Sequence, residues 1–318
     1  MTGMMRPRRI VIAFGGNASY PPTIKGLASE QFALIAQACR HLVRIIQSGY
    51  QVVLTHGNGP VVGNILFRMA KTATELPPMP MDVCVAHSQG GMGYMLQQTL
   101  VNVLREEGVA MAVSGVITQV EVDADDPCFA NPTKPVGRFF CHEDADRLAR
   151  EHAWHFVEDS GRGYRRVVPS PAPVRIVEIA AVEALLEANV IPITCGGGGI
   201  PVARDADGGL HGVSAVIDKD ATSAMLASEL GAQTLLMLTG VERVALDFGK
   251  PTERALERLT ATEARRHLAD GQFPPGSMGP KIAAALRYLD HGGGETIITS
   301  LDRAYDALAG SAGTRIVP

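Results

Sequence analysis

Three lysines stand out in a chain whose basic residues are mostly arginines. Of the 29 basic residues, six are lysines. Lys134 lies in the sequence NPTKPVG, Lys219 lies in VIDKD, and Lys281 follows PPGSMGP. A lysine ammonium is a compact charge on a flexible stem, which suits a phosphoryl group that moves between donor and acceptor oxygens. The three lysines are therefore candidates to stabilise a transferring phosphoryl group, and the alternative for each one alone is a solvated surface side chain.

Two carboxylates flank the middle lysine of this set. Asp218 and Asp220 stand on either side of Lys219. Such a pair could bind a metal ion, or it could orient the lysine ammonium. The alternative is a pair of aspartates at the beginning of a helix, where the helix dipole favours negative charge. The sequence leaves these interpretations open.

Glycines gather where three apolar segments end. The clusters are Gly15-Gly16-Asn17, Gly57-Asn58-Gly59 and the run 196–199. In open parallel sheets, ligands bind beyond the carboxyl ends of the strands, and glycine there lets backbone N–H groups approach an anion. One cluster is equally well explained as a turn, but three at the same end of one sheet indicate a phosphate site. The patterns GxxxxGK[ST] and GxGxxG are missing from the sequence, which disfavours a Walker-type NTPase and an ordinary dinucleotide fold.

Apolar segments alternate with amphipathic helices along most of the chain. In the first helix, Phe32, Ile35, Cys39, Val43 and Ile46 recur at three- and four-residue spacing and share one face. Strands are predicted at 9–14, 51–55, 110–113, 190–195, 234–238 and 295–299, and further helices at 178–187, 221–230 and 281–289. This alternation predicts an α/β fold in which helices cover both faces of a mainly parallel sheet.

The segment 121–173 breaks this alternation. It is polar and rich in proline, and its hydrophobic periodicity is poor. A structureless loop of this length is uncommon inside a compact domain. We therefore expect a single domain over residues 1–318 that carries an inserted subdomain at 121–173.

Composition and charge exclude several classes of protein. The formal net charge of −4 and the pI near 6.1 show no basic excess of the kind that nucleic-acid-binding proteins carry. No stretch reaches the ~18 consecutive apolar residues that suggest a membrane span. The five cysteines form no CxxC pair, which predicts reduced thiols and a cytoplasmic protein. The histidines show no metal-binding spacing, and His56 and His87, beside glycine-rich turns, are expected to be structural, so no set of metal-ligating residues is predicted.

Several long stretches resemble the carbamate kinases, a family with the amino acid kinase fold. The stretches that carry the resemblance are FGGNA (14–18), THGNGP (55–60), SQGGMGYMLQQ (88–98), TQVEVDADDPCFANPTKPVG (118–137), RRVVPSPAPVRIVE (165–178), CGGGGIPV (195–202), GVSAVIDKDATSAMLA (212–227), FGKPTER (248–254) and GQFPPGSMGPK (271–281). They run nearly from end to end of the chain.

The resemblance implies a reversible transfer of a phosphoryl group between ATP and carbamate, giving ADP and carbamoyl phosphate, with ATP formation often the useful direction. It implies a three-layer αβα sandwich around an eight-stranded sheet, a homodimer, and a protruding subdomain, here 121–173, that closes over the substrate. It also implies Mg²⁺ bound with ATP or ADP, small-molecule substrates, and neither nucleic acid nor membrane as a partner.

The same resemblance assigns roles to individual residues. Lys134, Lys219 and Lys281 would be catalytic, with Asp220 orienting the last two. The residues implied to hold the phosphoryl and carbamate end are Gly15, Gly16, Asn17, Gly57, Asn58 and Gly59. The residues implied to lie near the nucleotide are Thr239, Gly240, Pro275, Gly276, Ser277 and Met278.

Two other functions stay open at this point. One is a kinase of the same fold that acts on another small carboxylate or carbamate-like acceptor, since Ser214, Arg138 and His87 depart from the usual pattern of the family. The other is a nucleotide-binding regulatory protein without catalysis, because a fold does not by itself determine a function.

Overall fold

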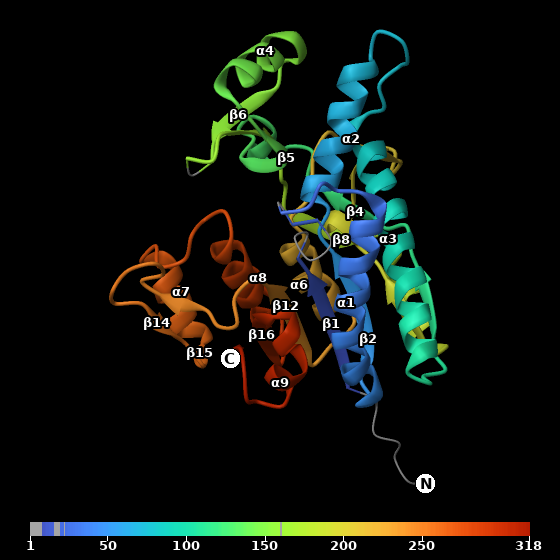
Figure 1. The fold of residues 1–318 in the computed structure, drawn as a ribbon, viewed down its shortest axis with the longest axis vertical. Helices are drawn as coiled ribbons and strands as arrows, with labels where there is room; N and C mark the ends of the chain where they lie inside the picture. Colours follow the sequence, from blue (N-terminus) through green and yellow to red (C-terminus); the bar gives the residue numbers. More distant parts are fainter. Residues whose placement is uncertain (1–7, 16–19, 22, 160) are drawn as a thin grey trace.

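An eight-stranded sheet forms the centre of the computed structural model, which describes residues 8–15, 20–21, 23–159 and 161–318 (Figure 1). The strand order is β15-β17-β16-β12-β1-β2-β9-β3. The strands are β1 (Arg9–Phe14), β2 (Gln51–His56), β3 (Ala112–Gly115), β9 (Val190–Ile193), β12 (Thr234–Thr239), β15 (Arg258–Thr260), β16 (Glu295–Ser300) and β17 (Thr314–Val317). All neighbours are parallel except β16 and β17. The expected α/β class with a mainly parallel sheet is confirmed.

Helices cover both faces of this sheet, because successive side chains of its buried strands point to opposite sides. Ile10 and Ile12 of β1 pack in one core with α1 (Ala28–Gln47), α3 (Met81–Glu106) and α9 (Ala304–Leu308). Val11 and Ala13 pack in a second core with the helices of the other face. Those helices are α5 (Ile179–Glu187), α6 (Lys219–Glu229), α7 (Ala261–Ala269) and α8 (Met278–Asp290). The result is the expected three-layer sandwich.

Two helices between β2 and β3 are absent from the sequence expectations. They are α2 (Gly59–Thr72) and α3. The glycine-rich turn expected beside His87 is wrong, since Gly90 and Gly91 lie within the 26 residues of α3. Glycine weakens a helix by about 1 kcal/mol per residue, but α3 packs along α1 over a long buried face, and this packing overrides the local preference.

The predicted boundaries also shift at two strands. Strand β3 begins at Ala112 instead of residue 110. Strand β9 ends at Ile193 because Cys195 adopts a left-handed backbone conformation with φ of 51°, which turns the chain into the short helix η3 (Gly196–Gly198).

The segment 121–173 begins and ends in a second sheet and holds a third one between these points. The second sheet has the order β11-β10-β4-β8, with β4 (Gln119–Val122), β8 (Pro173–Ile176), β10 (Ile200–Arg204) and β11 (Leu210–Gly212). The third sheet is antiparallel and contains β5 (Lys134–Phe140), β6 (His155–Glu158) and β7 (Tyr164–Val168), with η2 (Pro127–Phe129) before it and α4 (His142–His152) within it. In Figure 1, α4 and β6 project beyond the main sheet, beside α2.

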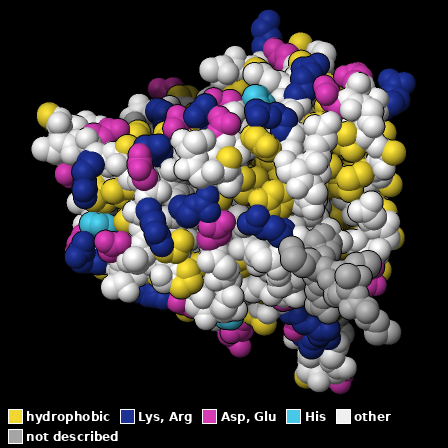
Figure 2. Space-filling view, turned by 90° about the horizontal axis from the view of Figure 1, so that it is seen from below, with side chains coloured by type: hydrophobic (Ala, Val, Ile, Leu, Met, Phe, Trp, Pro, Cys, Tyr) yellow, Lys and Arg dark blue, Asp and Glu magenta, His cyan; other side chains and the backbone are white. Residues whose placement is uncertain are grey.

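The remaining elements complete the periphery. They are β13 (Ala245–Leu246), β14 (Arg254–Ala255) and η4 (Leu301–Arg303). The face seen from below in Figure 2 carries basic and acidic side chains intermixed, in keeping with the small net charge. None of the helices in the described ranges has the length and hydropathy needed to cross a membrane.

Four neighbouring strands of the main sheet, β12, β1, β2 and β9, are mutually parallel, so their carboxyl ends lie along one edge. Thr239, Gly15, Gly57 and the glycine run 196–199 follow or end these strands. This is the edge at which an open parallel sheet binds its ligands.

The stability of the protein depends on burial in the central strands. Leu54 of β2 is fully buried, whereas Leu76 is 64% exposed. We expect Leu54→Ala to lower the free energy of unfolding by about 2–5 kcal/mol, because it removes buried methyl groups and leaves a cavity. Leu76→Ala makes the same chemical change at the surface and should leave the urea midpoint within experimental error. Equal midpoints for the two variants would contradict this view of the core.

Candidate functional site

Two lysine ammonium groups share one buried carboxylate at the start of α6. Lys219 Nζ donates to Asp220 Oδ1 at 2.6 Å, and Lys281 Nζ donates to Asp220 Oδ2 at 2.9 Å. Asp220 is 6% exposed and Lys281 is 8% exposed. Since two positive charges meet one negative charge, this buried group carries a net positive charge.

The beginning of α6 brings these residues to the strand ends. The Asp218 carboxylate caps α6 by accepting from the backbone N–H groups of Asp220 and Ala221. Further along the helix, Thr222 Oγ1 donates to the carbonyl of Gly198, and Ser223 Oγ bonds Thr55 Oγ1 of β2. The cap and these two bonds fix the first turn of α6 between β2 and the glycine run after β9. Helix α8 packs against α6 and supplies Lys281.

Burial and neighbouring charges move the ionisation of both partners. Burial lowers the pKa of Lys219 to about 8, the nearby Asp220 carboxylate opposes this shift, and the Lys281 ammonium adds to it. Burial alone would raise the pKa of Asp220, but the attraction of Lys219 and Lys281 outweighs it and holds this pKa far below the usual range. Asp220 is therefore an anion at neutral pH, and Lys219 is protonated below about pH 8.

Lys134 reaches the same place from a distant part of the chain. Its Nζ donates to Asp218 Oδ2 at 2.8 Å from the first residue of β5. Burial raises the pKa of the Asp218 carboxyl, but the Lys134 ammonium is the strongest of the opposing effects, and the net pKa is lowered. The three lysines singled out in the sequence thus converge on the two aspartates that flank Lys219.

The loop after β2 lies beside this cluster. The N–H of Gly57 donates to the carbonyl of Phe14 at the end of β1, and Gly59 begins α2. Asn58 is buried, and its Nδ2 donates to Ser88 Oγ of α3 at 2.7 Å. Gly15 follows β1 on the neighbouring strand. Gly16 and Asn17, predicted for the same site, lie outside the described residues.

The glycine run after β9 supports this loop by close packing. A Cβ on Gly197 would lie 2.1 Å from the Asn58 side chain, and a Cβ on Gly196 would lie 2.4 Å from the His56 ring. Gly197 also has a φ of 69°, which a larger residue adopts only under strain. All glycines of the run are buried. The run therefore positions Asn58 and His56 by close packing.

The residues predicted near a nucleotide occupy two loops, one after β12 and one before α8. Thr239 ends β12 and Gly240 follows it, exposed. Pro275, Gly276 and Ser277 form an exposed turn that leads into α8 at Met278. Helix α8 packs against β12, so the turn stands near the same sheet edge as the lysine cluster.

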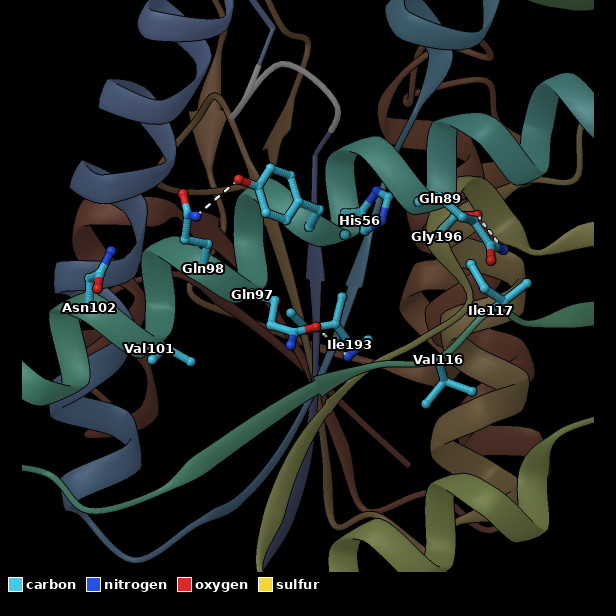
Figure 3. Close-up of a pocket in the computed structure, with 14 residues that line it drawn as sticks. His56, Gln89, Gln97, Gln98, Val101, Asn102, Val116, Ile117, Ile193 and Gly196 are labelled. Atoms are coloured by element: carbon cyan, nitrogen blue, oxygen red, sulfur yellow. Dashed lines mark hydrogen bonds between the residues drawn. The ribbon is translucent and has the colours of Figure 1, made fainter.

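A buried amide that the sequence expectations did not identify holds the glycine run to α3. Gln89 donates through Nε2 to the carbonyls of Thr118 and Gly196, and its Oε1 accepts from the Thr118 N–H. Gln89 and Gly196 meet at one end of a cavity of about 420 Å³, which continues along α3 past Gln97 and Val101 (Figure 3). The motif SQGG was the sequence signal at this position, but its partners lie far away in the chain.

The ionisation of Lys219 can be measured directly because the chain has so few lysines. We expect one lysine signal in a ¹³C-lysine NMR titration to have its midpoint near pH 8, protonated below and neutral above it, and to vanish in Lys219→Arg. Asp220→Asn removes the carboxylate that favours the ammonium, so the midpoint should fall. A midpoint for Lys219 above pH 10, or one that rises in Asp220→Asn, would contradict the described charge balance.

Comparison with known proteins agrees with this arrangement. The model of the amino acid kinase family matches residues 8–300. Carbamate kinase from Pyrococcus furiosus is 48% identical over 98% of this chain and 99% of its own length. The carbamate kinase-like protein YahI from Escherichia coli is 46% identical over 97% of this chain and 98% of its own length. The structure of carbamate kinase from Giardia lamblia bound to AMP-PNP superposes with a TM-score of 0.90 and 42% identity, and covers 99% of both chains. The chain therefore belongs to the amino acid kinase family and, within it, to the carbamate kinases.

Proposed function

We propose that this protein is a carbamate kinase that transfers a phosphoryl group reversibly between ATP and carbamate. The observation that carries the proposal is the convergence of Lys134, Lys219 and Lys281 on two aspartates at the carboxyl ends of parallel strands. Relatives of nearly full length that bear the name carbamate kinase support the choice of carbamate as acceptor.

The reaction forms one P–O bond and breaks another. A carbamate oxygen attacks the γ-phosphorus of ATP, and the bond from that phosphorus to the β,γ-bridging oxygen breaks, so that ADP departs with the electron pair. Carbamoyl phosphate and ADP give ATP by the reverse step. Phosphoryl transfer spreads negative charge over the peripheral oxygens, and catalysis is mostly positioning and electrostatic stabilisation. Protein side chains therefore need to supply charge and alignment, and a covalent intermediate is unnecessary.

Lys219 and Lys281 would supply that charge. Both ammonium groups donate hydrogen bonds to the Asp220 carboxylate, which keeps the two nitrogens close together. The carboxylate neutralises only part of their combined positive charge. An incoming phosphoryl group meets a site that is already desolvated and already positive, so little reorganisation accompanies the transfer. Asp220 acts in this scheme as an orienting residue.

The two ends of the substrates would lie on either side of the lysines. Gly15, Gly57, Asn58 and Gly59 would cradle the carbamate and the transferring phosphoryl, together with Gly16 and Asn17. Thr239, Gly240 and the turn Pro275-Gly276-Ser277-Met278 would hold the nucleotide. The support for this division is the position of both groups at one sheet edge, with Lys219 and Lys281 between them in α6 and α8.

Magnesium would enter the site with the nucleotide. Among residues 8–15, 20–21, 23–159 and 161–318, no three His, Cys, Asp or Glu side chains are grouped to hold a metal ion. Mg²⁺ commonly takes most of its ligands from substrate phosphates and water, with one or two carboxylates. Asp218, a half-buried carboxylate beside Lys219 that also bonds Lys134, would be the protein ligand that fits that role. When bound, the ion would neutralise charge on the phosphates of ATP or ADP.

We also propose that the subdomain at 121–173 closes over the substrates and carries Lys134 with it. The three-stranded sheet and α4 pack around a small cluster of Phe140, Ala145 and Leu148, against which Phe67 of α2 also packs. Lys134 stands on β5 of this unit, yet its Nζ reaches Asp218 of the main domain. Closure would bring the ammonium to the transferring phosphoryl group.

The test of the proposed function is ATP formation by purified protein from ADP, Mg²⁺ and carbamoyl phosphate. Carbamate kinase activity predicts ATP in proportion to carbamoyl phosphate consumed. ATP formed with acetyl phosphate or another acyl phosphate, and not with carbamoyl phosphate, would identify a different acceptor. Nucleotide binding without transfer to any acceptor would identify a regulatory protein and refute the proposal.

The same assay tests the role of Lys219. Lys219→Ala should lower kcat by at least ~100-fold, about 2.7 kcal/mol, since it removes a positive charge from the transferring phosphoryl group. Lys250 is an exposed lysine that pairs with Asp247, so Lys250→Ala is the matched control and should keep its kcat. Unchanged turnover by Lys219→Ala would exclude the assigned role.

We propose that the protein acts as a homodimer in the cytoplasm, within arginine metabolism. All five cysteines are free, which suits a reducing compartment. Strand β3 forms one edge of the main sheet, and Tyr94, Val101 and Ile117 are exposed beside it along the cavity of Figure 3. A sheet edge with apolar neighbours is suited to pair with the same edge of a second copy around a two-fold axis.

Val101→Asp should therefore shift the protein toward monomers in light scattering after size exclusion, because it places a charge in the proposed contact. Val174, 59% exposed on β8, is the matched control, and Val174→Asp should leave the dimer intact. A wild-type protein that is monomeric at micromolar concentration would refute the dimer.

A further inference from the structure

Two glycines from distant parts of the chain bring the projecting subdomain into backbone contact with the main domain. Gly63 lies in α2, and Gly137 lies in β5, three residues after Lys134. A Cβ on Gly63 would lie 2.0 Å from the Cα of Gly137 and 2.2 Å from its N. Atoms of a main chain cannot rotate away as the end of a side chain can. Any side chain at position 63 therefore requires β5 to move away from α2.

The contact is fixed from the other side of β5 as well. Arg165 Nη2 of β7 donates to the Gly137 carbonyl at 3.2 Å. Gly137 has a φ of 75°, in the left-handed region that favours glycine, and the pairing of β5 with β7 changes register between Val136 and Phe140. The backbone of β5 is thus bent at the point where it touches α2.

Val136 continues the same contact toward Lys134. Val136 is 1% exposed and packs in one core with Val62 and Leu66 of α2. Lys134 pairs with Val168 in the register of β5 and β7, and its Nζ lies 2.8 Å from Asp218 Oδ2. Three residues of extended chain span about 10 Å, so a displacement at Gly137 is passed to Lys134 through a short, buried segment.

We propose that Gly63 is a positioning residue: its lack of a side chain sets how closely β5 approaches α2 and so places the Lys134 ammonium at the site. The inference rests on the catalytic role proposed for Lys134. In this view the Gly63–Gly137 contact sets the position of the subdomain against α2. This role is separate from any closing movement of the subdomain.

The test combines Gly63→Ala with Lys134→Ala in the ATP-formation assay. Gly63→Ala should lower kcat at least ~10-fold, because the added Cβ moves β5. In the Lys134→Ala background the same change should alter kcat by less than about twofold, since the group through which it acts is already gone. Gly91→Ala is the matched control, a glycine inside α3 with no atom within 4 Å of its Cβ position, and it should keep its kcat.

Two results of this cycle would overturn the proposal. One is a Gly63→Ala enzyme with wild-type kcat. The other is a loss that is undiminished in the Lys134→Ala background, which would assign the effect to the start of α2 at Asn58 and Gly59. If Gly63→Ala does not fold, Gly137→Ala tests the same contact by the same cycle, because its Cβ meets the Gly63 Cα at 3.1 Å, and its φ of 75° adds backbone strain at the same point of β5.

A structural measurement separates this inference from the proposed function. In a crystal structure of Gly63→Ala, or of Gly137→Ala, the Lys134 Nζ to Asp218 Oδ2 distance should exceed the ~4 Å limit of an ion pair. An unchanged distance would refute the positioning role. Absence of ATP formation by the wild-type enzyme would instead refute the proposed function, and the distance would still decide the role of Gly63.

Discussion

A single carboxylate that holds two ammonium groups is the interaction on which the site depends. Asp220 is buried, and water cannot stabilise it, so it must be satisfied by its partners. Lys219 and Lys281 come from different helices, and their shared attachment to Asp220 ties α6 to α8 at the sheet edge. Removing either lysine leaves one charge pair, but removing Asp220 leaves two like charges side by side in a buried place. The net positive charge that remains is the feature that makes the site fit a phosphoryl group.

The fold could be predicted in outline because its signals are local. Strands β1, β2, β12 and β16 read as short apolar runs, and the faces of α1 and α8 repeat at helical spacing. Helix α3 was not predicted, because Gly90, Gly91 and Gly93 are poor helix formers within its sequence. The helix is stabilised by packing against α1, which a local sequence pattern does not show. The projecting segment was visible only as a loss of pattern, because the pairing of β5 with β7 in its three-stranded sheet joins residues far apart in the chain.

In the candidate site too, residues with a local sequence signal could be predicted and residues defined by distant contacts could not. Lys134, Lys219 and Lys281 could be singled out by residue type and by glycine- or proline-rich surroundings, and the clusters after β1 and β2 by their place after apolar runs. Gln89 and Gly63 could not, because an amide and a glycine inside helices look ordinary until their partners are known. Gln89 bonds Gly196 across 107 positions, and Gly63 meets Gly137 across 74. Such contacts are properties of the assembled backbone and have no signature in spacing.

The two oxygens of Asp218 serve different parts of the molecule. Oδ1 accepts from the first N–H groups of α6, and Oδ2 receives the ammonium of Lys134. If Lys134 moved away from Asp218, α6 would therefore keep both of its capping hydrogen bonds. The projecting subdomain and α6 therefore each bond a different oxygen of the same carboxylate. The proposed closure of the subdomain would thus leave intact the turn of α6 that presents Lys219.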